Sequence, residues 1–227
     1  MIGIIGAMEK EIAMLREKME NMQETTVGRT RFYQGMLWGK EVCLALCGIG
    51  KIHAALCAQA MILHFNPEAV INIGVAGALD RELDIGDMVI GAFGVQHDMD
   101  TTAFGDPMGC IPEINIVELP CAPHLIAAME KAAAEQGLYH ITAGIATGDQ
   151  FIHQQDKKQW LRQHFGAAAC DMEGAAIAQV CFEFQVPYGA YRAISDTLEG
   201  DEKEYMKKAM IAANASQRLL EAFLSQL

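Results

Sequence analysis

The sequence predicts a single-domain α/β fold, a three-layer arrangement in which helices flank a central mixed, twisted β-sheet. Short apolar runs alternate with segments of helical periodicity along most of the 227 residues, a pattern typical of strands joined by helical crossovers. Two extended runs lie back to back between residues 31 and 47, so part of the sheet is expected to be antiparallel. No linker rich in Pro, Gly or Ser divides the chain, and its length suits one domain over residues 1–227.

The first elements follow from local patterns. The apolar run Ile2–Ala7 predicts a buried strand, and apolar residues at helical spacing predict a helix over Met8–Met22. Extended runs follow at Arg31–Trp38 and Glu41–Cys47. The alanine-rich segment Lys51–Leu63 predicts the next helix, because alanine has the highest helix propensity.

The rest of the chain continues the alternation after one long interruption. Strands are predicted at Ala69–Val75 and Asp87–Gln96, and the irregular stretch His97–Glu118 follows them. A loop of this length in a compact domain is usually functional or lies at an interface. The remaining elements are, in chain order, a helix at Pro123–Gln136 with Pro near its start, where Pro is tolerated, a strand at Tyr139–Thr147, a helix at Asp156–His164, a strand at Ala167–Asp171, a helix at Glu173–Phe184, a strand at Pro187–Ile194 and a helix from about Glu202 to Leu224.

The composition limits the classes of function. Lys and Arg number 17 against 29 Asp and Glu, which gives a formal net charge of −12. So acidic a chain repels phosphate backbones and anionic membranes, and we expect neither nucleic acid nor a membrane as its partner. A small neutral or cationic ligand is easier to accommodate. With 52% hydrophobic residues the chain is expected to bury a full core rather than to be disordered.

The seven cysteines indicate a reducing, cytoplasmic environment. Cys43, Cys47, Cys57 and Cys181 lie inside apolar runs and are typical of small core residues rather than of a disulfide framework. No CxxC pair occurs, which disfavours a zinc ribbon or a thioredoxin-like site. We also expect no signal peptide, and no apolar stretch reaches the ~20 residues that cross a bilayer.

Acidic residues follow three of the predicted strands. Glu11 comes shortly after the first strand, Glu173 after the strand Ala167–Asp171, and Asp196 after the strand Pro187–Ile194. In open α/β sheets, ligands bind beyond the carboxyl ends of the strands. The sequence therefore predicts that these three carboxylates lie near one edge of the sheet.

Converging carboxylates can bind a metal, grip sugar hydroxyls or act as acid and base. We expect no metal, because no histidines at ligand spacing accompany them; His97, Asp98 and Asp100 form a separate loop cluster with a capping or solvated role as the simpler interpretation. Acid–base chemistry needs one carboxyl that stays protonated near neutral pH and another that stays ionised. Asp196, at an apolar strand end, fits the first description, and Glu11, in the first turn of a helix, fits the second.

Seven segments, in a constant order and spacing, also carry a resemblance to a known family. They are Ile2–Glu11, Gly48–Lys51, Gly74–Gly77, His97–Asp100 with Thr102–Gly105, Thr147–Ile152, Asp171–Ala175 and Arg192–Asp196. These segments resemble the bacterial 5′-methylthioadenosine/S-adenosylhomocysteine nucleosidases, and the resemblance covers essentially the whole chain. It implies a nucleoside phosphorylase-like fold, a homodimer, and hydrolysis of the N-glycosidic bond of adenine nucleosides that carry a 5′-thioether. No cofactor is implied.

The resemblance also implies roles for individual residues. Asp196 is the expected acid that protonates adenine N7, and Glu11 is the expected base that activates water, with Arg192 nearby. Glu173 and Met172 are expected to hold the ribose. The other expected binding residues are Phe151 stacked on adenine, the Ile152 backbone at its edge, Met8, Ile49 and Tyr205 around the 5′ substituent, Val75 near the water or ribose, and Phe104 and Pro112 reaching in from a partner subunit.

Two departures from the family pattern keep alternatives open. Val75 stands where many members carry Ser, and a subgroup that cleaves 6-amino-6-deoxyfutalosine looks similar there, which widens the possible substrates. Asp171 stands where the family usually has Glu. Phosphorolysis is one alternative, although it needs basic donors for phosphate and only Arg192 lies at a predicted strand end. A nucleoside-binding protein without turnover is the other.

Overall fold

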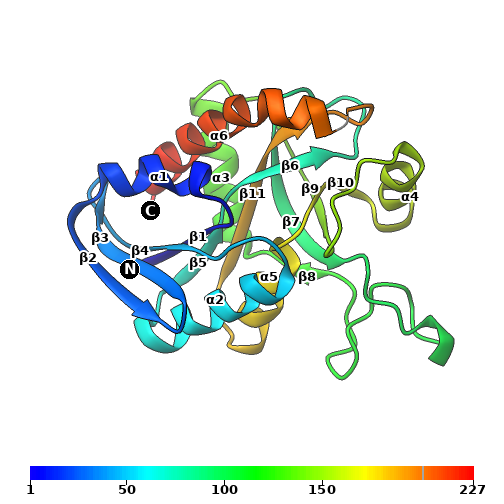
Figure 1. Ribbon diagram of the computed structural model, residues 1–227, viewed down its shortest axis with the longest axis horizontal. Coiled ribbons are helices and arrows are strands. Elements are labelled where there is room, and N and C mark those ends of the chain that lie inside the picture. The colour runs from blue at the N-terminus through cyan, green and yellow to red at the C-terminus, as the bar shows by residue number, and fades with distance from the viewer. Residues whose placement is uncertain (201) are drawn as a thin grey trace.

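One mixed β-sheet runs through the part of the chain that the structure describes, and helices pack on both of its faces (Figure 1). The computed structural model describes residues 1–200 and 202–227, without the side chains of residues 202–204, 206 and 207. The strands are β1 (Ile2–Gly6), β2 (Glu20–Val27), β3 (Thr30–Leu37), β4 (Lys40–Leu46), β5 (Ala69–Asn72), β6 (Val75–Ala78), β7 (Met88–Gln96), β8 (Leu119–Pro120), β9 (His140–Thr147), β10 (Ala167–Asp171) and β11 (Tyr188–Asp196). The helices are α1 (Glu9–Lys18), α2 (Lys51–Phe65), α3 (Pro123–Glu135), α4 (Gln155–Phe165), α5 (Gly174–Glu183) and α6 (Glu202–Leu224), with a 3₁₀ turn η1 (Thr102–Phe104).

The sheet is mixed, as predicted. Its strand order is β2-β3-β4-β1-β5-β11-β6-β10-β9-β7-β8. β1 runs parallel to β4 and β5, β11 runs parallel to β5 and β6, and β2, β3 and β4 form an antiparallel meander. β7 also pairs antiparallel with β11, so the sheet curls back on itself around β6, β10 and β9. The prediction of a partly antiparallel sheet is therefore confirmed.

The helices cover the two faces of the sheet in separate groups. Figure 1 shows α1, α3 and α6 on one face and α2 with α5 on the other, while α4 lies beside β9 and β10. α3 shows why such helices form: Leu125, Met129, Ala132 and Ala133 recur at helical spacing and are buried, and Pro123 occupies its first turn. The three-layer α/β fold expected from the sequence is confirmed. None of the helices in the described part of the chain is long and apolar enough to cross a membrane.

The predicted helix Met8–Met22 is wrong beyond Lys18. The chain turns at Met19, and Glu20–Val27 forms β2, which pairs antiparallel with β3. All of β2 except Val27 is solvent-exposed, so it has no apolar alternation to distinguish it from the polar face of a helix. The strand forms because β3 supplies partners for its backbone N–H and C=O groups.

The predicted strand Ala69–Val75 is in fact two strands. β5 and β6 lie on opposite sides of β11, and the chain crosses between them at Ile73 and Gly74. Gly74 has φ +155°, and a Cβ there would lie 2.9 Å from Oε1 of Glu11. The crossing therefore needs glycine both for its backbone conformation and for the close approach of Glu11.

The predicted long loop His97–Glu118 is confirmed as irregular apart from η1 and one bridge between Ile111 and Ile116. It extends away from the body of the molecule at the lower right of Figure 1. Phe104 lies on this loop with 88% of its surface exposed.

Candidate active site

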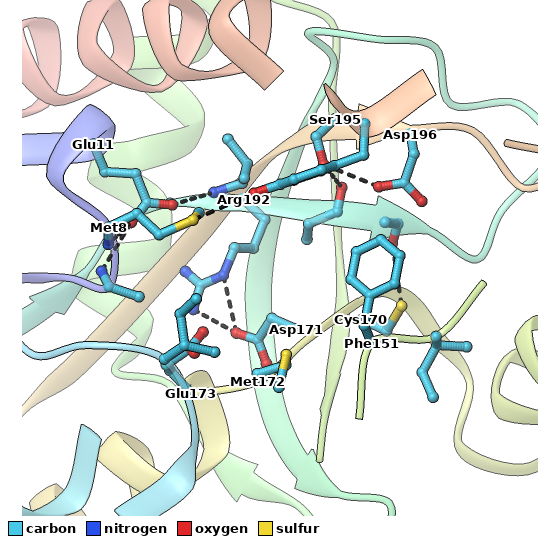
Figure 2. Close-up of a pocket in the computed structure, with 18 of the residues that line it drawn as sticks. Met8, Glu11, Phe151, Cys170, Asp171, Met172, Glu173, Arg192, Ser195 and Asp196 are labelled. Carbon is cyan, nitrogen blue, oxygen red and sulfur yellow. Dashed lines mark hydrogen bonds and ion pairs between the residues drawn. The ribbon is translucent and has the colours of Figure 1, made fainter. Parts of the chain in front are cut away.

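A pocket of about 290 Å³ lies beyond the carboxyl ends of β1, β5, β10 and β11. This is the edge at which the three carboxylates were expected to meet. Figure 2 shows Glu11 on the left of the pocket, Asp196 on the right and Glu173 below them. The residues singled out from the sequence that line it are Met8, Glu11, Ile49, Val75, Phe151, Ile152, Met172, Glu173, Arg192, Asp196 and Tyr205. Phe104 and Pro112 do not line it and are exposed on the long loop.

Glu11 is buried at the amino end of α1 and is fixed by three backbone N–H groups. Its Oε2 accepts hydrogen bonds from Ala7 N at 2.8 Å and Met8 N at 2.9 Å, and its Oε1 accepts one from Val75 N at 3.2 Å. Burial raises the pKa of Glu11, while the Met8 N–H and the charge of Arg192 oppose that rise. The result is a rigid carboxyl whose proton affinity lies above that of an exposed glutamate.

Asp196 is buried at the end of β11. Its Oδ1 accepts a hydrogen bond from Ser195 Oγ at 3.0 Å, and its Oδ2 lies 2.9 Å from Nζ of Lys158. Gly77 faces the carboxyl so closely that a Cβ there would lie 2.8 Å from Oδ2. Glycine at 77 therefore leaves room for this carboxyl at the wall of the pocket.

Glu173 comes directly after β10 and before α5. Its Oε1 accepts a hydrogen bond from Gly50 N at 2.8 Å, which ties it to the start of α2. Burial and the negative charge of Asp171 raise the pKa of Glu173 to about 7, against the opposing effects of the Gly50 N–H and Arg192. Glu173 therefore titrates in the physiological range.

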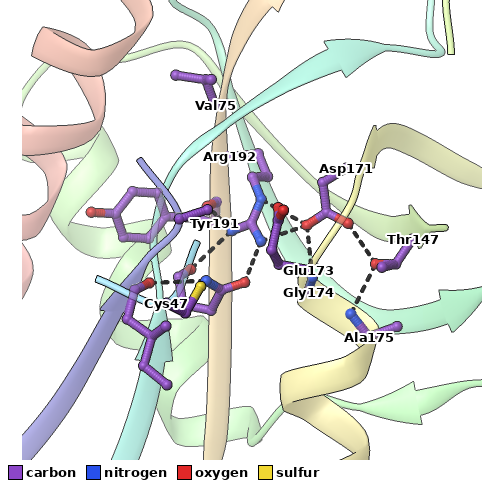
Figure 3. Close-up of polar contacts among 12 residues, drawn as sticks. Cys47, Val75, Thr147, Asp171, Glu173, Gly174, Ala175, Tyr191 and Arg192 are labelled. Atoms are coloured by element: carbon purple, nitrogen blue, oxygen red, sulfur yellow. Dashed lines mark hydrogen bonds and ion pairs between the residues drawn. The ribbon is translucent and has the colours of Figure 1, made fainter. Parts of the chain in front are cut away.

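Arg192 forms the centre of a buried polar network (Figure 3). Its Nε and Nη2 donate to Oδ2 of Asp171 at 3.0 and 2.5 Å, Nη1 donates to the backbone oxygens of Asn72 and Tyr191, and Nη2 donates to Oδ1 of Asn72. Oδ1 of Asp171 accepts from Thr147 Oγ1 at 2.5 Å. Every N–H donor of the guanidinium has a protein partner, so Arg192 supplies charge to the pocket and holds Asp171 rather than offering a donor to a ligand.

One end of the pocket is largely apolar. The Phe151 ring meets the Tyr205 ring edge-on, with 5.7 Å between ring centroids, and Ile49 is more than half exposed at the rim. Tyr205 OH donates to Sδ of Met8 at 3.3 Å and accepts from Nζ of Lys10 at 2.7 Å. Tyr205 thus connects α6 to α1 across this end, where an apolar ligand group is best accommodated.

Lys158 is the residue of the site that the sequence interpretation missed. It lies on α4 with its side chain fully buried and contacts Asp196. A signal did exist: Lys158, Leu161 and Phe165 are spaced as one face of a helix, and all three are buried. A lysine inside an otherwise apolar stripe indicates a buried cation with an acidic partner.

Asp98 and Asp100 of the loop cluster make structural contacts, whereas neither ring nitrogen of the buried His97 has a hydrogen-bond partner among the described residues. Asp98 pairs with Nζ of Lys51 at 2.6 Å and accepts from Asp149 N at 2.9 Å, and Asp100 accepts from Thr102 N at 3.0 Å. Across the described residues, no group of three or more His, Cys, Asp or Glu side chains is arranged to hold a metal ion.

The chain is similar to known proteins over its whole length. The phosphorylase superfamily matches residues 1–225. The 5′-methylthioadenosine/S-adenosylhomocysteine nucleosidase of Staphylococcus haemolyticus is 39% identical over the full length of both chains. The crystal structure of the corresponding nucleosidase of Neisseria meningitidis, in complex with methylthio-immucillin-A, superposes with a TM-score of 0.95 at 38% identity, covering 100% of this chain and 99% of that one.

A futalosine hydrolase of Helicobacter pylori is almost as similar in structure. Its TM-score is 0.94 at 36% identity, and the match covers 100% of this chain and 97% of the other. Identity at this level over whole chains, together with the match to the superfamily, establishes the relationship. This chain belongs to the phosphorylase superfamily and, within it, to the family of 5′-methylthioadenosine/S-adenosylhomocysteine nucleosidases.

Proposed function

We propose that this chain hydrolyses the N-glycosidic bond of adenine nucleosides with a 5′-thio substituent, such as 5′-methylthioadenosine and S-adenosylhomocysteine. The products are adenine and the corresponding thio-ribose. The observation that carries the proposal is the pair of buried carboxyl groups, Glu11 and Asp196, on opposite sides of one pocket that also has an apolar end (Figure 2). The family relationship supports the same reaction.

Asp196 is the general acid of the proposed reaction. Adenine is a poor leaving group as an anion, and a proton delivered to N7 lets it depart as a neutral molecule. The C1′–N9 bond then breaks and Asp196 is left as a carboxylate. A positioned acid of this kind contributes roughly 10²–10⁴-fold to the rate. Asp196 is buried at the wall of the pocket, which supports this role.

Glu11 is the general base. A water molecule between Glu11 and the anomeric carbon gives its proton to the carboxylate as its oxygen bonds to C1′. Three backbone N–H groups fix the orientation of Glu11, and burial raises its pKa towards the range in which a base is most effective. Both features support the assignment.

Glu173 and Met172 hold the ribose in the proposal. An ionised Glu173 accepts hydrogen bonds from ribose hydroxyls, and its charge stabilises the positive charge that develops on the sugar as the glycosidic bond breaks. Arg192 keeps Asp171 in place beside it and balances part of the negative charge of the pocket. This arrangement suits a cationic sugar-like transition state.

Adenine and the 5′ substituent have different partners within the pocket. Phe151 stacks on adenine and the Ile152 backbone meets its edge. The 5′ substituent lies against Met8, Ile49 and Tyr205, whose apolar surfaces suit a thioether that needs few hydrogen bonds. Val75 is the other wall residue singled out, and it offers the reacting centre a methyl surface where a serine would offer a hydroxyl.

Hydrolysis is favoured over phosphorolysis because the described pocket lining offers no basic side chain with free hydrogen-bond donors for phosphate. Of the described residues that line the pocket, only Arg192 is basic, and all its donors are used within the protein. Phosphate would therefore find no free guanidinium there. The test is adenine release from methylthioadenosine, S-adenosylhomocysteine and aminodeoxyfutalosine, each with and without phosphate. Release that depends strictly on phosphate, or binding with no release at all, would overturn hydrolysis.

A homodimer completes the proposed site. Ile52 and Leu56 lie one turn apart on α2 with 71% and 62% of their surfaces exposed, and Phe104 is even more exposed on the extended loop. Two exposed apolar side chains on one helix, and a third on the long loop, support burial against a second copy. In the proposed dimer Phe104 and Pro112 of each subunit reach the 5′ end of the other's pocket. We further propose a cytoplasmic location, because all seven cysteines are free thiols.

A further inference from the structure

Lys158 is a fully buried lysine attached to the acid end of the pocket. Its side chain has 0% exposure, and that of Asp196 has 3%. Its Nζ lies 2.9 Å from Oδ2 of Asp196, 2.7 Å from the backbone oxygen of Thr197 and 3.2 Å from that of Gly200. An ammonium group has three N–H donors, so each one has an acceptor.

These contacts join three separate parts of the fold. Lys158 comes from α4, Asp196 ends β11, and Thr197 and Gly200 belong to the segment that follows β11. A buried ammonium without an anionic partner is strongly unfavourable, so the position of Lys158 is coupled to that of the Asp196 carboxyl. The lysine therefore fixes both the carboxyl and the chain on its far side.

We propose that Lys158 is a positioning residue for the acid step, which holds the Asp196 carboxyl and stabilises the carboxylate that remains after its proton has moved to N7. This inference rests on the proposed nucleosidase function. The proton balance is simple: the O–H bond of Asp196 breaks, the N7–H bond forms, and the negative charge left on Asp196 faces the positive charge of Lys158. The ammonium keeps its own protons throughout.

Lys158 is a charged side chain in direct contact with Asp196. The described groups near Asp196 also include the titratable Cys170 from β10 and the uncharged Ser195 and backbone of β6. Burial, followed by the charge of Asp196, raises the pKa of Cys170 to about 12, so this thiol stays neutral. A change in the charge at position 158 therefore acts directly on the ionisation of Asp196.

The sign of the expected effect follows from electrostatics. A neighbouring cation favours the ionised form of a carboxyl, so its removal makes Asp196 hold its proton more tightly. Proton transfer to N7 then becomes slower, and the protonated form persists to higher pH. Loss of Lys158 should consequently lower kcat and move the alkaline fall of kcat/KM to higher pH.

The test uses the full-length protein with Lys158→Met, Lys158→Gln and Lys158→Arg, and Lys157→Met as the control from the same helix. Lys157 lies over the Trp160 ring, with 4.0 Å from Nζ to the ring centroid. We expect adenine release from methylthioadenosine to show a kcat at least about 10-fold lower in both neutral variants, with KM changed less than about 3-fold. The alkaline limit should move upward in both, and Lys158→Arg should restore most of kcat. Lys158→Gln can still donate to the backbone acceptors, so it serves as the readout if Lys158→Met does not fold.

A double variant separates positioning from simple loss of stability. In an Asp196→Asn background the acid is already absent, so Lys158→Gln should reduce kcat by less than about 2-fold further. Three results would overturn the inference: a kcat reduction by Lys158→Gln that is as large in the Asp196→Asn background as in the wild type, an unchanged alkaline limit, or neutral Lys158 variants with the kcat of Lys157→Met. If the wild-type protein still releases adenine in these cases, the proposed function stands. Absence of adenine release by the wild-type protein would overturn both.

Discussion

Two donors of Arg192 converge on one oxygen of Asp171, with Nε at 3.0 Å and Nη2 at 2.5 Å from Oδ2, and each side chain is only 2% exposed. This pair links β10 to β11 beneath the pocket. Arg192 places a positive charge close to Glu11 and Glu173 and opposes the effect of burial on the pKa of both carboxyls, whereas the charge of Asp171 adds to that effect at Glu173. The pair is therefore part of the electrostatics of the site as well as of its framework.

We expect Asp171→Ala to destabilise the protein by ~3–5 kcal/mol, because it leaves the Arg192 guanidinium buried without its anion. The free energy of unfolding, measured with a chemical denaturant, checks this value. The matched control is Glu9→Ala, which breaks the exposed Arg16–Glu9 pair and should change stability by at most ~1 kcal/mol. If the two substitutions lowered the free energy of unfolding by the same amount, the buried pair would stabilise the protein no more than the exposed pair does.

Glu173 gives a pH prediction with opposite signs in stability and in binding. Its pKa of about 7 in the folded protein lies above the ordinary value of 4.5, so its ionised form destabilises the fold above about pH 7 and this effect is relieved as the pH falls. Protonation at low pH also removes an acceptor from the ribose site. We therefore expect KM for methylthioadenosine to rise as pH falls from about 8 to about 6, and Glu173→Gln to abolish that rise.

The same substitution should raise Tm more at about pH 8 than at about pH 5, because only the ionised form of Glu173 is unfavourable when buried. Glu183→Gln, at the exposed far end of α5, provides the control and should leave both the KM profile and Tm unchanged. A KM profile in Glu173→Gln that still rises at low pH would assign the titration to another group.

Much of the fold follows from the apolar runs of the sequence. β1 and β10 were predictable because short, continuous apolar runs such as Ile2–Gly6 and Ala167–Asp171 are typical of strands that helices cover on both faces of a sheet. The rule that ligands bind at the carboxyl ends of strands then places Glu11, Glu173 and Asp196 at one edge of the sheet. Those two arguments are local and topological, and neither needs side-chain packing.

The features that were missed depend on tertiary pairing. β2 has no apolar pattern of its own and exists because β3 pairs with it. The division at Gly74 depends on the passage of β11 between β5 and β6, which are close in sequence and separated in space. The spacing of Lys158 with Leu161 and Phe165 indicates a buried position, but nothing near it in sequence identifies Asp196 as the acid that it contacts. Such relationships join distant segments, so a single sequence does not specify them.

Asp196→Asn should lower kcat for adenine release by at least about 10²-fold, because asparagine has the same shape but no acidic proton to give to N7. Steady-state kinetics with methylthioadenosine measures this. Asp156→Asn, an exposed position in the first turn of α4, is the control and should retain wild-type kcat. A kcat for Asp196→Asn near that of the wild type would remove the acid assignment.

Glu11→Gln should abolish turnover while adenine still binds. The amide of glutamine has only one acceptor oxygen, so its NH₂ group must face at least one of the N–H groups of Ala7, Met8 and Val75 that Glu11 now accepts. The water then loses its base and the side chain loses its fixed orientation. Calorimetry with adenine and an activity assay separate binding from turnover, and Glu9→Gln on the same helix is the exposed control. Retained turnover in Glu11→Gln would exclude it as the base.

Phe104→Ala tests the shared pocket, since this side chain is 88% exposed in one chain and contributes nothing to that chain's own core. We expect Tm to stay close to wild type and KM for methylthioadenosine to rise about tenfold or more, because the 5′ end of the partner's pocket loses an aromatic wall. The control is Tyr139→Ala, a second exposed aromatic residue at the opposite, amino-terminal end of β9. Sedimentation velocity on each variant shows whether the dimer persists. If Phe104→Ala remains dimeric with an unchanged KM, or if the wild-type protein is a fully active monomer, then the pocket is complete within one chain and the exposed phenylalanine has another use.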